Sequence, residues 1–454
     1  MVSNPNLFIQ GVMKSVRKIT ILGGGPAGIA IAYYAKENKI KYDLFEASNR
    51  VGGNCITFEY KGFLYDSGAH RLHDKDMETT RIIKEMMGND LKLIQVPSQI
   101  YREGKFIDFP LSPLNLLGFL GIRRFLYSAY QILGSKIRTK TNIDNFRDLA
   151  IHTYGKNISD LFLLHYTEKL WGKPASELSI DVAGKRLKGL NLKTFILETF
   201  RGKNDKTQHL DGSFYYPKYG IGSIFEAFNS HCGNHFHLNQ KVTAVYHSNQ
   251  KITGIELNGN SINDVEDLVS SLPLGVLLKV MHPPPPKKIL DLGNSILFRD
   301  IILIGLFLNV DSVNKNGSMY FPSNRYPFTR VYEPKNRSKH MAPEGKTSLM
   351  IEIPCQKNSG VWKEDEKTII KEVIRELVEA NIFNESDLFD SCIHKIKNAY
   401  PVLEKDYQTK INPIYDYLSN FENLKLTGRN GLFAYTHIHD HMINGKRIIN
   451  ILKQ

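Results

Sequence analysis

Cysteine is scarce in this chain. Only four cysteines occur among 454 residues, and no two of them stand at the spacing of a metal site or a redox pair. So few cysteines without a pattern are typical of reduced thiols, and we therefore expect a cytoplasmic protein. The first 18 residues also lack an apolar core followed by a cleavage site, which argues against a secretory signal. The cysteines are Cys55, Cys232, Cys355 and Cys392.

Long apolar runs are absent as well. The longest, near residues 114–120 and 301–310, are too short to span a bilayer. The net charge of +13 is not gathered into a block of Lys and Arg, and no nucleic-acid motif is present, so we expect no nucleic-acid partner. The charge fits either an ordinary basic surface or an anionic ligand or membrane. Residues 114–133, apolar around Arg123 and Arg124, leave peripheral membrane contact open.

A glycine-rich turn stands near the start of the chain. It follows residues 18–22 (KITIL), an apolar run predicted as a buried strand, and precedes an Ala-rich helix. Gly23 permits the tight turn, Gly25 lets a pyrophosphate approach the backbone, and Gly28 lets the helix pack on the strand. Glu46, 18 residues past Gly28 at the end of the next expected strand, can bind both ribose hydroxyls. Together with the free N–H groups of the helix N-terminus, these residues predict a dinucleotide site.

A second glycine pair specifies the kind of dinucleotide. Glu46 opens EASNRVGGN, in which Arg50, Gly52 and Gly53 complete the pattern ExxxRxGG. This turn resembles that of FAD proteins of the glutathione-reductase and amine-oxidase type, and it separates them from plain NAD dehydrogenases. The resemblance implies FAD as the cofactor. It also adds Asn54 and Val242 to the expected cofactor-binding residues.

The C-terminal part repeats the order of a strand, a glycine loop and a helix. Residues 424–427 are predicted as a short strand, and Gly428 and Arg429 follow in LKLTGRNG. This segment resembles the closing flavin motif of the same superfamily, so both residues are expected to bind the cofactor. A last helix is expected from about His441, with Asp440 placed to cap it. Its N-terminal amides would then face the pyrimidine edge of the flavin.

The length of the chain predicts more than one core. Nucleotide-binding elements stand at both ends. We therefore expect an α/β fold with a discontinuous, Rossmann-like FAD-binding domain of the glutathione-reductase type, a helical insertion and a separate, mainly antiparallel sheet. The proline run at 283–286 predicts a crossing between domains. The expected domains are residues 1–75, 207–280 and 405–454 for FAD, 76–206 for a mainly helical substrate domain, and 281–404 for a sheet-containing substrate domain.

Several further blocks resemble the UDP-galactopyranose mutases and the protoporphyrinogen-oxidase-like proteins, one branch of the FAD-dependent amine oxidase superfamily. The likeness covers nearly the whole chain. It implies a histidine loop beside the flavin, a substrate-domain signature and a paired-tyrosine loop that touches the flavin. The blocks are GGN at 52–54, GAHRLH at 68–73, YTEKLWG at 166–172, KRL at 185–187, FTRVYEPK at 328–335 and FAYTHIHD at 433–440.

Carried over residue by residue, the resemblance implies a site for a nucleotide-activated sugar. Arg186 and Arg330 would clamp the diphosphate, because guanidinium groups are always charged and match phosphate geometry. His70 would touch the flavin, and these three are the expected catalytic residues. The expected substrate-binding residues are Tyr166 and Trp171 along the nucleotide or sugar, Tyr435 as a donor to a phosphate oxygen, and His73.

Four of these residues also have a purely structural interpretation. Trp171 is one of only two tryptophans and fits a hydrophobic core. Arg186 lies in KRLK, a common solvated run, and Tyr435 fits simple packing. Arg330, in an expected strand, could instead pair with Glu333 or with a neighbouring strand.

Three histidines at alternate positions, His437, His439 and His441, form one more cluster. In an extended segment their side chains would share a face, and zinc is one interpretation. No cysteine lies near, and the segment falls where the flavin loop is expected, so we predict no metal site. We expect instead that one imidazole hydrogen-bonds the flavin or an anionic substrate.

Three functions are consistent with these patterns. The resemblance favours a mutase that interconverts pyranose and furanose forms of a nucleotide sugar through an adduct with N5 of reduced flavin, as in cell-surface polysaccharide biosynthesis. The second is an FAD-dependent oxidase or desaturase acting on an amine, porphyrinogen, lipid or modified sugar, and the third is a non-catalytic nucleotide-binding protein. No Ser-His-Asp or Cys-His arrangement offers a side-chain nucleophile. Since one dinucleotide fingerprint is present, any NAD(P)H would be a transient reductant.

Overall fold

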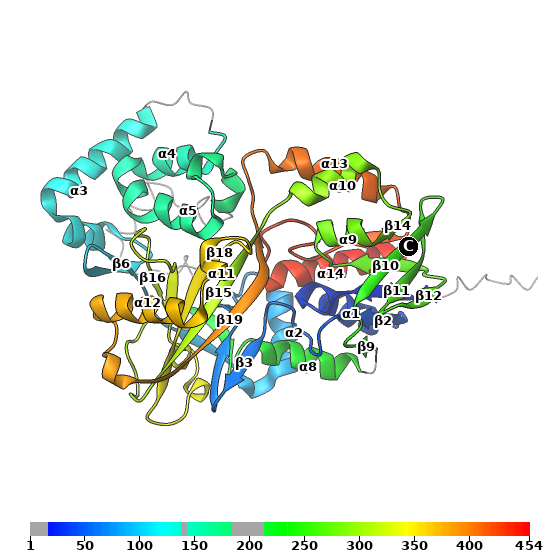
Figure 1. The fold of residues 1–454 in the computed structure, drawn as a ribbon, viewed down its shortest axis with the longest axis horizontal. Coiled ribbons are helices and arrows are strands. Elements are labelled where there is room, and N and C mark those ends of the chain that lie inside the picture. Colours follow the sequence, from blue (N-terminus) through cyan, green and yellow to red (C-terminus); the bar gives the residue numbers. More distant parts are fainter. Residues whose placement is uncertain (1–16, 138–142, 184–212, 234) are drawn as a thin grey trace, which may run out of the picture.

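A parallel sheet of five short strands organises the lobe at the right of Figure 1. The computed structural model describes residues 17–137, 143–183, 213–233 and 235–454. All four neighbouring strand pairs of this sheet are parallel, which confirms the expected discontinuous α/β nucleotide-binding fold. In spatial order the strands are β20 (Leu424–Leu426), β13 (Asp267–Ser270), β1 (Ile19–Leu22), β2 (Tyr42–Phe45) and β9 (Phe236–His237).

Helices cover one face of this sheet. α1 (Pro26–Glu37) follows β1 directly, and its small alanines allow α14 (Ile438–Leu452) to pack closely on it. A Cβ on Gly445 of α14 would lie only 3.0 Å from Cβ of Ala30, so both residues must stay small. α8 (Gly222–Cys232) and α2 (Met77–Met87) share the same hydrophobic core.

A small sheet and three helices cover the opposite face. Leu22 and Phe45 of the central strands share one core with Val245 and Ile255 of the small sheet. β14 (Met281–His282) and α10 (Lys287–Ser295) both pack in this lobe. The chain therefore crosses to the other lobe after α10 and not at the proline run 283–286. The boundaries of the three expected domains stay a prediction. The small sheet has the order β12 (Asn260–Asn263), β11 (Lys251–Leu257), β10 (Val242–Ser248), β14 (Met281–His282), and the helices are α9 (Leu274–Val280), α10 (Lys287–Ser295) and α13 (Tyr407–Ser419).

A seven-stranded, mainly antiparallel sheet forms the second lobe (Figure 1). Two adjacent inner strands, β15 (Phe298–Leu308) and β18 (Thr347–Cys355), are buried almost throughout. α12 (Glu366–Glu379) lays Ile369, Val373 and Leu377, four residues apart, against this sheet. The order is β19 (Leu388–Pro401), β15 (Phe298–Leu308), β18 (Thr347–Cys355), β17 (Arg330–Tyr332), β16 (Ser318–Tyr320), β6 (Ser98–Arg102) and β7 (Lys105–Phe109), of which β16 and β6 pair in parallel.

The segment expected to be mainly helical contains strands as well as helices. β6 and β7 form a hairpin because Glu103 and Gly104 both take positive φ angles, of 50° and 74°. β5 (Leu91–Gln95) pairs with β8 (Ser213–Pro217), and β3 (Thr57–Tyr60) pairs with β4 (Phe63–Asp66). Among the described residues of this part, the α-helices besides α2 are α3 (Pro113–Ile137), α4 (Phe146–Ile158) and α5 (His165–Trp171). Elsewhere, the short α11 (Gly360–Lys363) precedes α12.

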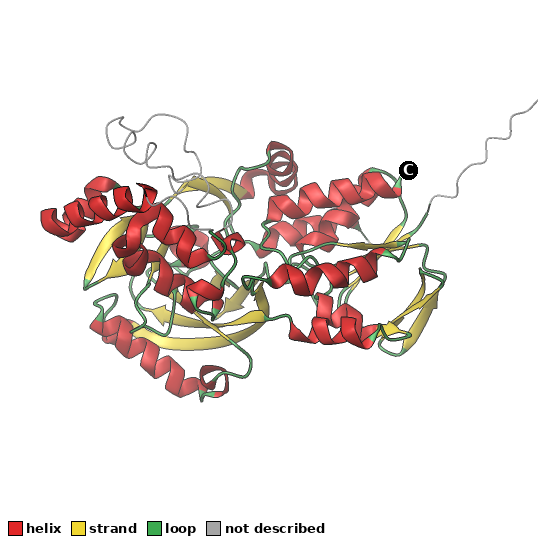
Figure 2. Cartoon of the chain, turned by 90° about the horizontal axis from the view of Figure 1, so that it is seen from above, coloured by secondary structure: helices red, strands yellow, loops and turns green. Residues whose placement is uncertain are grey.

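The two lobes lie side by side when the molecule is seen from above, and helices flank the strands of both (Figure 2). The loop Gly68–Ala69–His70 joins them, because the Ala69 amide donates to Glu352 on β18. The elements expected to bind the cofactor therefore meet the seven-stranded sheet at this loop.

Candidate functional site

The first glycine turn gives each of its glycines a distinct physical role. Gly23 has φ of +100°, which L side chains rarely adopt. A Cβ on Gly28 would come within 1.9 Å of the Gly23 carbonyl oxygen, so only glycine lets α1 start there. A Cβ on Gly25 would meet the protein only at Gly53 Cα, at 3.8 Å. Protein packing does not require glycine at 25, whereas a pyrophosphate approaching the backbone would.

The second glycine turn lies directly against the first. The Gly52 amide donates to the Gly24 carbonyl over 2.8 Å, and a Cβ on Gly53 would lie 3.0 Å from Gly25 Cα. Arg50 Nη1 donates to the Gly53 carbonyl at 3.2 Å. The two motifs, separate in the sequence, thus form one cradle lined by backbone.

Glu46 stands at the carboxyl end of β2, beside this cradle. One carboxylate oxygen accepts from the Gly24 amide at 2.6 Å, and the other accepts from the amide and hydroxyl of Ser48, both at 2.8 Å. The Glu46 carbonyl accepts from the amide of Gln240, two residues before Val242 at the start of β10. The segment that leads into Val242 therefore lies beside the end of β2 that carries Glu46.

The closing loop meets the same edge from the C-terminal side. Gly428 has φ of +83°, and a Cβ there would crowd Ser271 and Ala27 at 3.1 and 3.4 Å. Arg429 is fixed by the carbonyls of Ala399 and Thr436, at 3.2 and 2.6 Å. Its guanidinium therefore lies where the closing loop, β19 and the start of α14 come together.

The last helix begins three residues earlier than expected. Its N-cap is His437, and Asp440 is its third residue, whose carboxylate accepts from the His437 amide at 2.8 Å. Asp440 thus completes a capping box and is not itself the N-cap. Because His439 and His441 lie inside α14, the extended segment assumed for the zinc interpretation is wrong. Among the described residues, no group of three His, Cys, Asp or Glu side chains is arranged to hold a metal.

An arginine–glutamate pair dominates the sheet side of the site. Arg330 Nε and Nη2 donate to the Glu352 carboxylate at 2.9 and 2.5–2.8 Å, across the β17–β18 pair. Burial disfavours the charge on Arg330, but Glu352 and the neighbouring tyrosines together outweigh burial and hold the guanidinium pKa well above its usual value. Of the two structural alternatives for Arg330, the neighbouring strand is the one observed. Glu333 is held instead by Thr347 and the Val313 amide.

Tyrosines gather around Arg330. The rings of Tyr166 on α5 and Tyr320 on β16 lie 5.9 Å apart, edge to face, and Tyr400 on β19 is 5.9 Å from Tyr435. Burial raises the pKa of Tyr166 and of Tyr400 well above the usual value, so both hydroxyls stay protonated and can donate. Arg429 stacks over the Tyr400 and Tyr435 rings at 5.5 and 5.2 Å.

His70 lies between this cluster and the glycine cradle. Its Nε2 is 3.0 Å from the Asn54 carbonyl and 3.3 Å from the Ser67 hydroxyl. Burial, with Arg429, Arg330 and Arg337 nearby, lowers the pKa of His70 to about 3, so the imidazole is neutral at physiological pH. A neutral ring that donates from Nε2 to a carbonyl leaves Nδ1 as an acceptor.

Two buried cations, neither identified from the sequence, hold α5 to the seven-stranded sheet. Lys169 donates to the carbonyls of four residues in one loop, at 2.7–3.0 Å. Arg299 on β15 donates to the carbonyls of Lys169 and Leu170 at 3.0 and 3.1 Å, which satisfies the C-terminus of the helix. Their effect is to fix Tyr166 and Trp171 relative to Arg330. The carbonyls that Lys169 reaches belong to Phe321, Ser323, Tyr326 and Phe328.

The structure brings together most, but not all, of the residues expected at the substrate. Trp171 is 3% exposed and packs on Tyr400 and Tyr435, so it lies in the wall of the site. His73 lies beside Phe214 of β8, and Arg186 falls outside the described residues. Tyr320, Tyr400 and Glu352 join the site without having been predicted.

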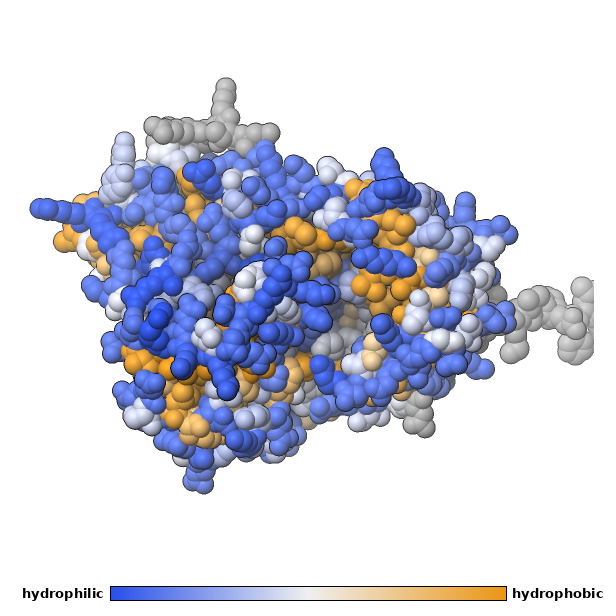
Figure 3. Space-filling view, viewed as in Figure 1, coloured by the Kyte–Doolittle hydropathy of each residue, from blue (hydrophilic) through white to orange (hydrophobic). Residues whose placement is uncertain are grey.

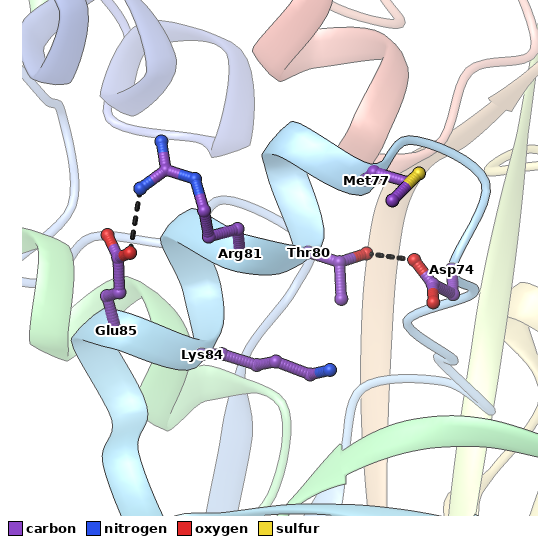
Figure 4. A pocket seen from close by; sticks show the side chains of 6 residues that line it. All are labelled: Asp74, Met77, Thr80, Arg81, Lys84 and Glu85. Atoms are coloured by element: carbon purple, nitrogen blue, oxygen red, sulfur yellow. Dashed lines mark hydrogen bonds and ion pairs between the residues drawn. The ribbon is translucent and has the colours of Figure 1, made fainter.

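A shallow cavity elsewhere in this lobe runs along α2 (Figure 4). Its lining comes from that helix and the loop before it, and two internal pairs occupy much of its wall: Arg81 with Glu85, and Thr80 with Asp74, both at 2.7 Å. None of the residues predicted for the cofactor or substrate lines it. The cavity is therefore separate from the candidate site.

These residues fit a bound FAD, with the glycine cradle for the pyrophosphate, Glu46 for a ribose, and the α14 N-terminus beside His70 for the flavin. The fold and the site define an FAD-binding flavoenzyme of the α/β class. Residues 26–386 match the family described as flavin containing amine oxidoreductase, and the chain belongs to this family. Its cofactor is FAD.

Related sequences are oxidoreductases. The chain is 23% identical to protoporphyrinogen oxidase 2 of Arabidopsis thaliana over 159 residues, which are 34% of this chain and 30% of that protein. It is 22% identical to 4,4'-diapophytoene desaturase of Staphylococcus aureus over 424 residues, or 81% of this chain and 82% of the desaturase. The chain thus aligns with less than a third of the plant enzyme.

Solved structures share the fold at low identity. Reduced UDP-galactopyranose mutase superimposes with a TM-score of 0.80 and 21% identity, covering 96% of this chain and 95% of the mutase. A protein described as a putative protoporphyrinogen oxidase from an Exiguobacterium species gives a TM-score of 0.76 and 15% identity, covering 97% and 100%. No helix among the described residues is long and apolar enough to cross a membrane.

Proposed function

We propose that this flavoenzyme is a mutase that interconverts the pyranose and furanose forms of a nucleotide-activated sugar. The observation that carries the proposal is the gathering of Tyr166, Tyr320 and Tyr400 around Arg330. A wall of phenol hydroxyls around a guanidinium suits an anionic substrate rich in acceptor oxygens. The fold shared with UDP-galactopyranose mutase supports the same substrate class.

Arg330 keeps one end of its guanidinium available despite its ion pair. Its contacts to Glu352 use Nε and Nη2, so Nη1 makes no hydrogen bond with the described residues. The Glu352 carboxylate, only 2% exposed, fixes the plane of the fork. We assign Nη1, together with the Tyr166 and Tyr400 hydroxyls, to one or two oxygens of the substrate diphosphate.

The described residues supply orientation and no nucleophile. Reduced flavin, when bound, would supply the electron pair for this chemistry, while the residues of the site hold the nucleoside diphosphate as it leaves and returns. Arg330 keeps the displaced diphosphate in place for that return. Neutral His70 offers an acceptor beside the cofactor, and Trp171 closes the wall against water.

The decisive experiment uses dithionite-reduced, FAD-loaded protein with UDP-galactopyranose or UDP-galactofuranose, and chromatography to follow their interconversion. Arg330→Ala is expected to lower kcat/KM about a hundredfold, as for the loss of one charged donor to a reacting group. Arg325→Ala is the matched control, because Arg325 is exposed and its ion pairs with the described residues are to Glu376 and Glu379 of α12. Absence of interconversion across a panel of nucleotide sugars would contradict the proposal.

An FAD-dependent oxidoreductase is the second candidate, and the sequence relatives favour it. On that alternative, oxidised flavin takes a hydride from an uncharged substrate, and the tyrosine wall serves as an aromatic cage. Arg186→Ala separates the two candidates, since an uncharged substrate needs no second diphosphate arginine. An Arg186→Ala protein that keeps its turnover with an artificial electron acceptor would favour the oxidoreductase.

A further inference from the structure

Helix α3 changes character at its kink: before Gly121 it buries Leu116 and Leu120 in the core, whereas after Gly121 it turns polar side chains toward α4 and several large apolar side chains toward the surroundings. Toward α4, Gln131 accepts from the Asn157 amide at 2.8 Å, and Ser128 accepts from the Asn157 side chain at 2.7 Å. Ser135 donates to the His152 carbonyl at 3.1 Å. A helix on the surface of a protein in water normally has the opposite orientation, with its apolar stripe against the core.

The opposite side of the helix carries large apolar side chains. After the kink at Gly121, they recur at helical spacing and are 54–72% exposed. Burial of side chains of this size in an apolar medium is favourable, and contiguous exposed apolar surface marks an interaction site. Figure 3 shows this apolar surface at the left edge of the molecule, over the end occupied by α3 in Figure 1. The residues are Ile122, Leu126, Tyr127, Tyr130 and Leu133.

The charged residues in the sequence of this helix and just beyond it have one sign. Residues 109–143 contain five Lys or Arg and no Asp or Glu. Arg124 points toward the body of the molecule, where it pairs with Glu103 at 3.1 Å, whereas Arg123 is exposed next to Ile122. Apolar and tyrosine side chains beside basic residues are the composition of helices that lie in the interface of anionic membranes.

We propose that the outer face of α3 docks on an anionic lipid surface, with the helix axis parallel to the membrane plane. Charge complementarity selects this partner over a second copy of the chain. In a two-fold dimer the same face meets itself, so exposed Arg123 of one copy would meet the like-charged face of the other. Phosphatidylglycerol headgroups offer the opposite charge, and the acyl boundary accepts Ile122, Leu126 and Leu133.

The test measures binding of the FAD-loaded protein to phosphatidylcholine vesicles with and without phosphatidylglycerol. We expect binding to the anionic vesicles that weakens as salt is added, and little binding to pure phosphatidylcholine. Leu126→Ser/Leu133→Ser is expected to weaken binding about tenfold or more, because two large apolar contacts are lost. Arg123→Glu is expected to weaken it by a similar factor.

A matched control removes the same number of exposed apolar side chains from other parts of the surface. Met77→Ser/Ile451→Ser removes residues that are 86% and 44% exposed on other helices, and vesicle binding is expected to stay at the wild-type level. Flavin absorbance and the melting midpoint of each variant show that it has folded. Wild-type protein that ignores anionic vesicles, or Leu126→Ser/Leu133→Ser protein that binds them equally, would overturn the proposal. So would a wild-type dimer in light scattering that this double variant turns into a monomer, since the partner would then be a second copy.

Discussion

The same substitution at two glycines three residues apart is expected to have opposite consequences. Gly25 has φ of −75° and ψ of 179°, an extended conformation open to any residue, and an added Cβ would touch only Gly53 Cα at 3.8 Å. Apo Gly25→Ala protein should therefore fold normally. It should even gain about 0.5 kcal/mol, because alanine has fewer conformations to lose on folding. Gly28→Ala, by contrast, places a methyl group 1.9 Å from the Gly23 carbonyl oxygen.

The two variants also differ in which property is weakened: FAD binding in Gly25→Ala and folding stability in Gly28→Ala. In Gly25→Ala the methyl group takes the space of the pyrophosphate, and the loss of one or two charge-assisted backbone hydrogen bonds corresponds to about 2–4 kcal/mol, or a thirty- to thousandfold weaker Kd for FAD. In Gly28→Ala the start of α1 must move by about 1 Å from the turn, which costs about 3 kcal/mol of folding free energy.

The assay has two parts: unfolding of the apoprotein by urea, and titration of the apoprotein with FAD followed by flavin fluorescence. Gly25→Ala should match the wild type in urea unfolding but bind FAD more weakly in the titration. Gly28→Ala should already be less stable than the wild type in urea unfolding. If apo Gly25→Ala is as unstable as apo Gly28→Ala, or if it binds FAD like the wild type, then the assignment of Gly25 to the pyrophosphate is wrong.

Three further predictions concern buried polar groups. Lys169→Met should destabilise the protein by about 2–3 kcal/mol in urea unfolding, because four carbonyls lose a charged donor, whereas Lys173→Met, at a more exposed ion pair, should cost less than about 1 kcal/mol. Burial lowers the pKa of His441 to about 3, below that of the unfolded chain, so His441 alone should lower stability by about 1.4 kcal/mol per pH unit as the pH falls from about 6.5 toward 3; His441→Gln should make the acid slope shallower by that amount. A double-mutant cycle of Arg330→Met and Glu352→Gln should give a coupling of about 2 kcal/mol or more, because either single change leaves a buried partner unpaired.

Each of these predictions has a contradicting result. Equal losses of unfolding free energy in Lys169→Met and Lys173→Met would mean that water satisfies the four carbonyls as well as the Lys169 side chain does. An unchanged acid slope in His441→Gln would assign acid unfolding to other groups. Additive effects of Arg330→Met and Glu352→Gln would mean that the pair is not coupled in the native state.

The cofactor motifs were predictable because they are local. Gly23, Gly25 and Gly28 act within one turn. Their spacing, and the strand and helix on either side of them, can be recognised from one short stretch of sequence. The start of α14 was misplaced for an equally local reason. Its N-cap is His437, a residue type that rarely signals a helix start, so the helix was expected only from about His441.

The substrate wall was only partly predictable because strand register decides it. Glu352 contacts Arg330 because β17 and β18 pair these two positions directly, although 22 positions separate them in the sequence. Tyr320 and Tyr400 come from strands at different places in the same sheet, and nothing near them in the sequence resembles a motif. Lys169 lies inside the recognised YTEKLWG block, but its four carbonyl partners belong to a loop more than 150 residues away.

The charge balance of the site indicates which residue separates the two candidate functions. Glu352 neutralises most of the charge of Arg330, and carbonyl oxygens hold Arg429 in place. A diphosphate carries about two negative charges, so on the mutase proposal Nη1 of Arg330 and the tyrosine hydroxyls would bind it by hydrogen bonds and leave much of its charge uncompensated. The mutase proposal therefore requires a second cation, and Arg186, which lies outside the described residues, is the one that the sequence offers. An oxidoreductase with an uncharged substrate has no such need, which makes Arg186→Ala more informative than any change at Arg330.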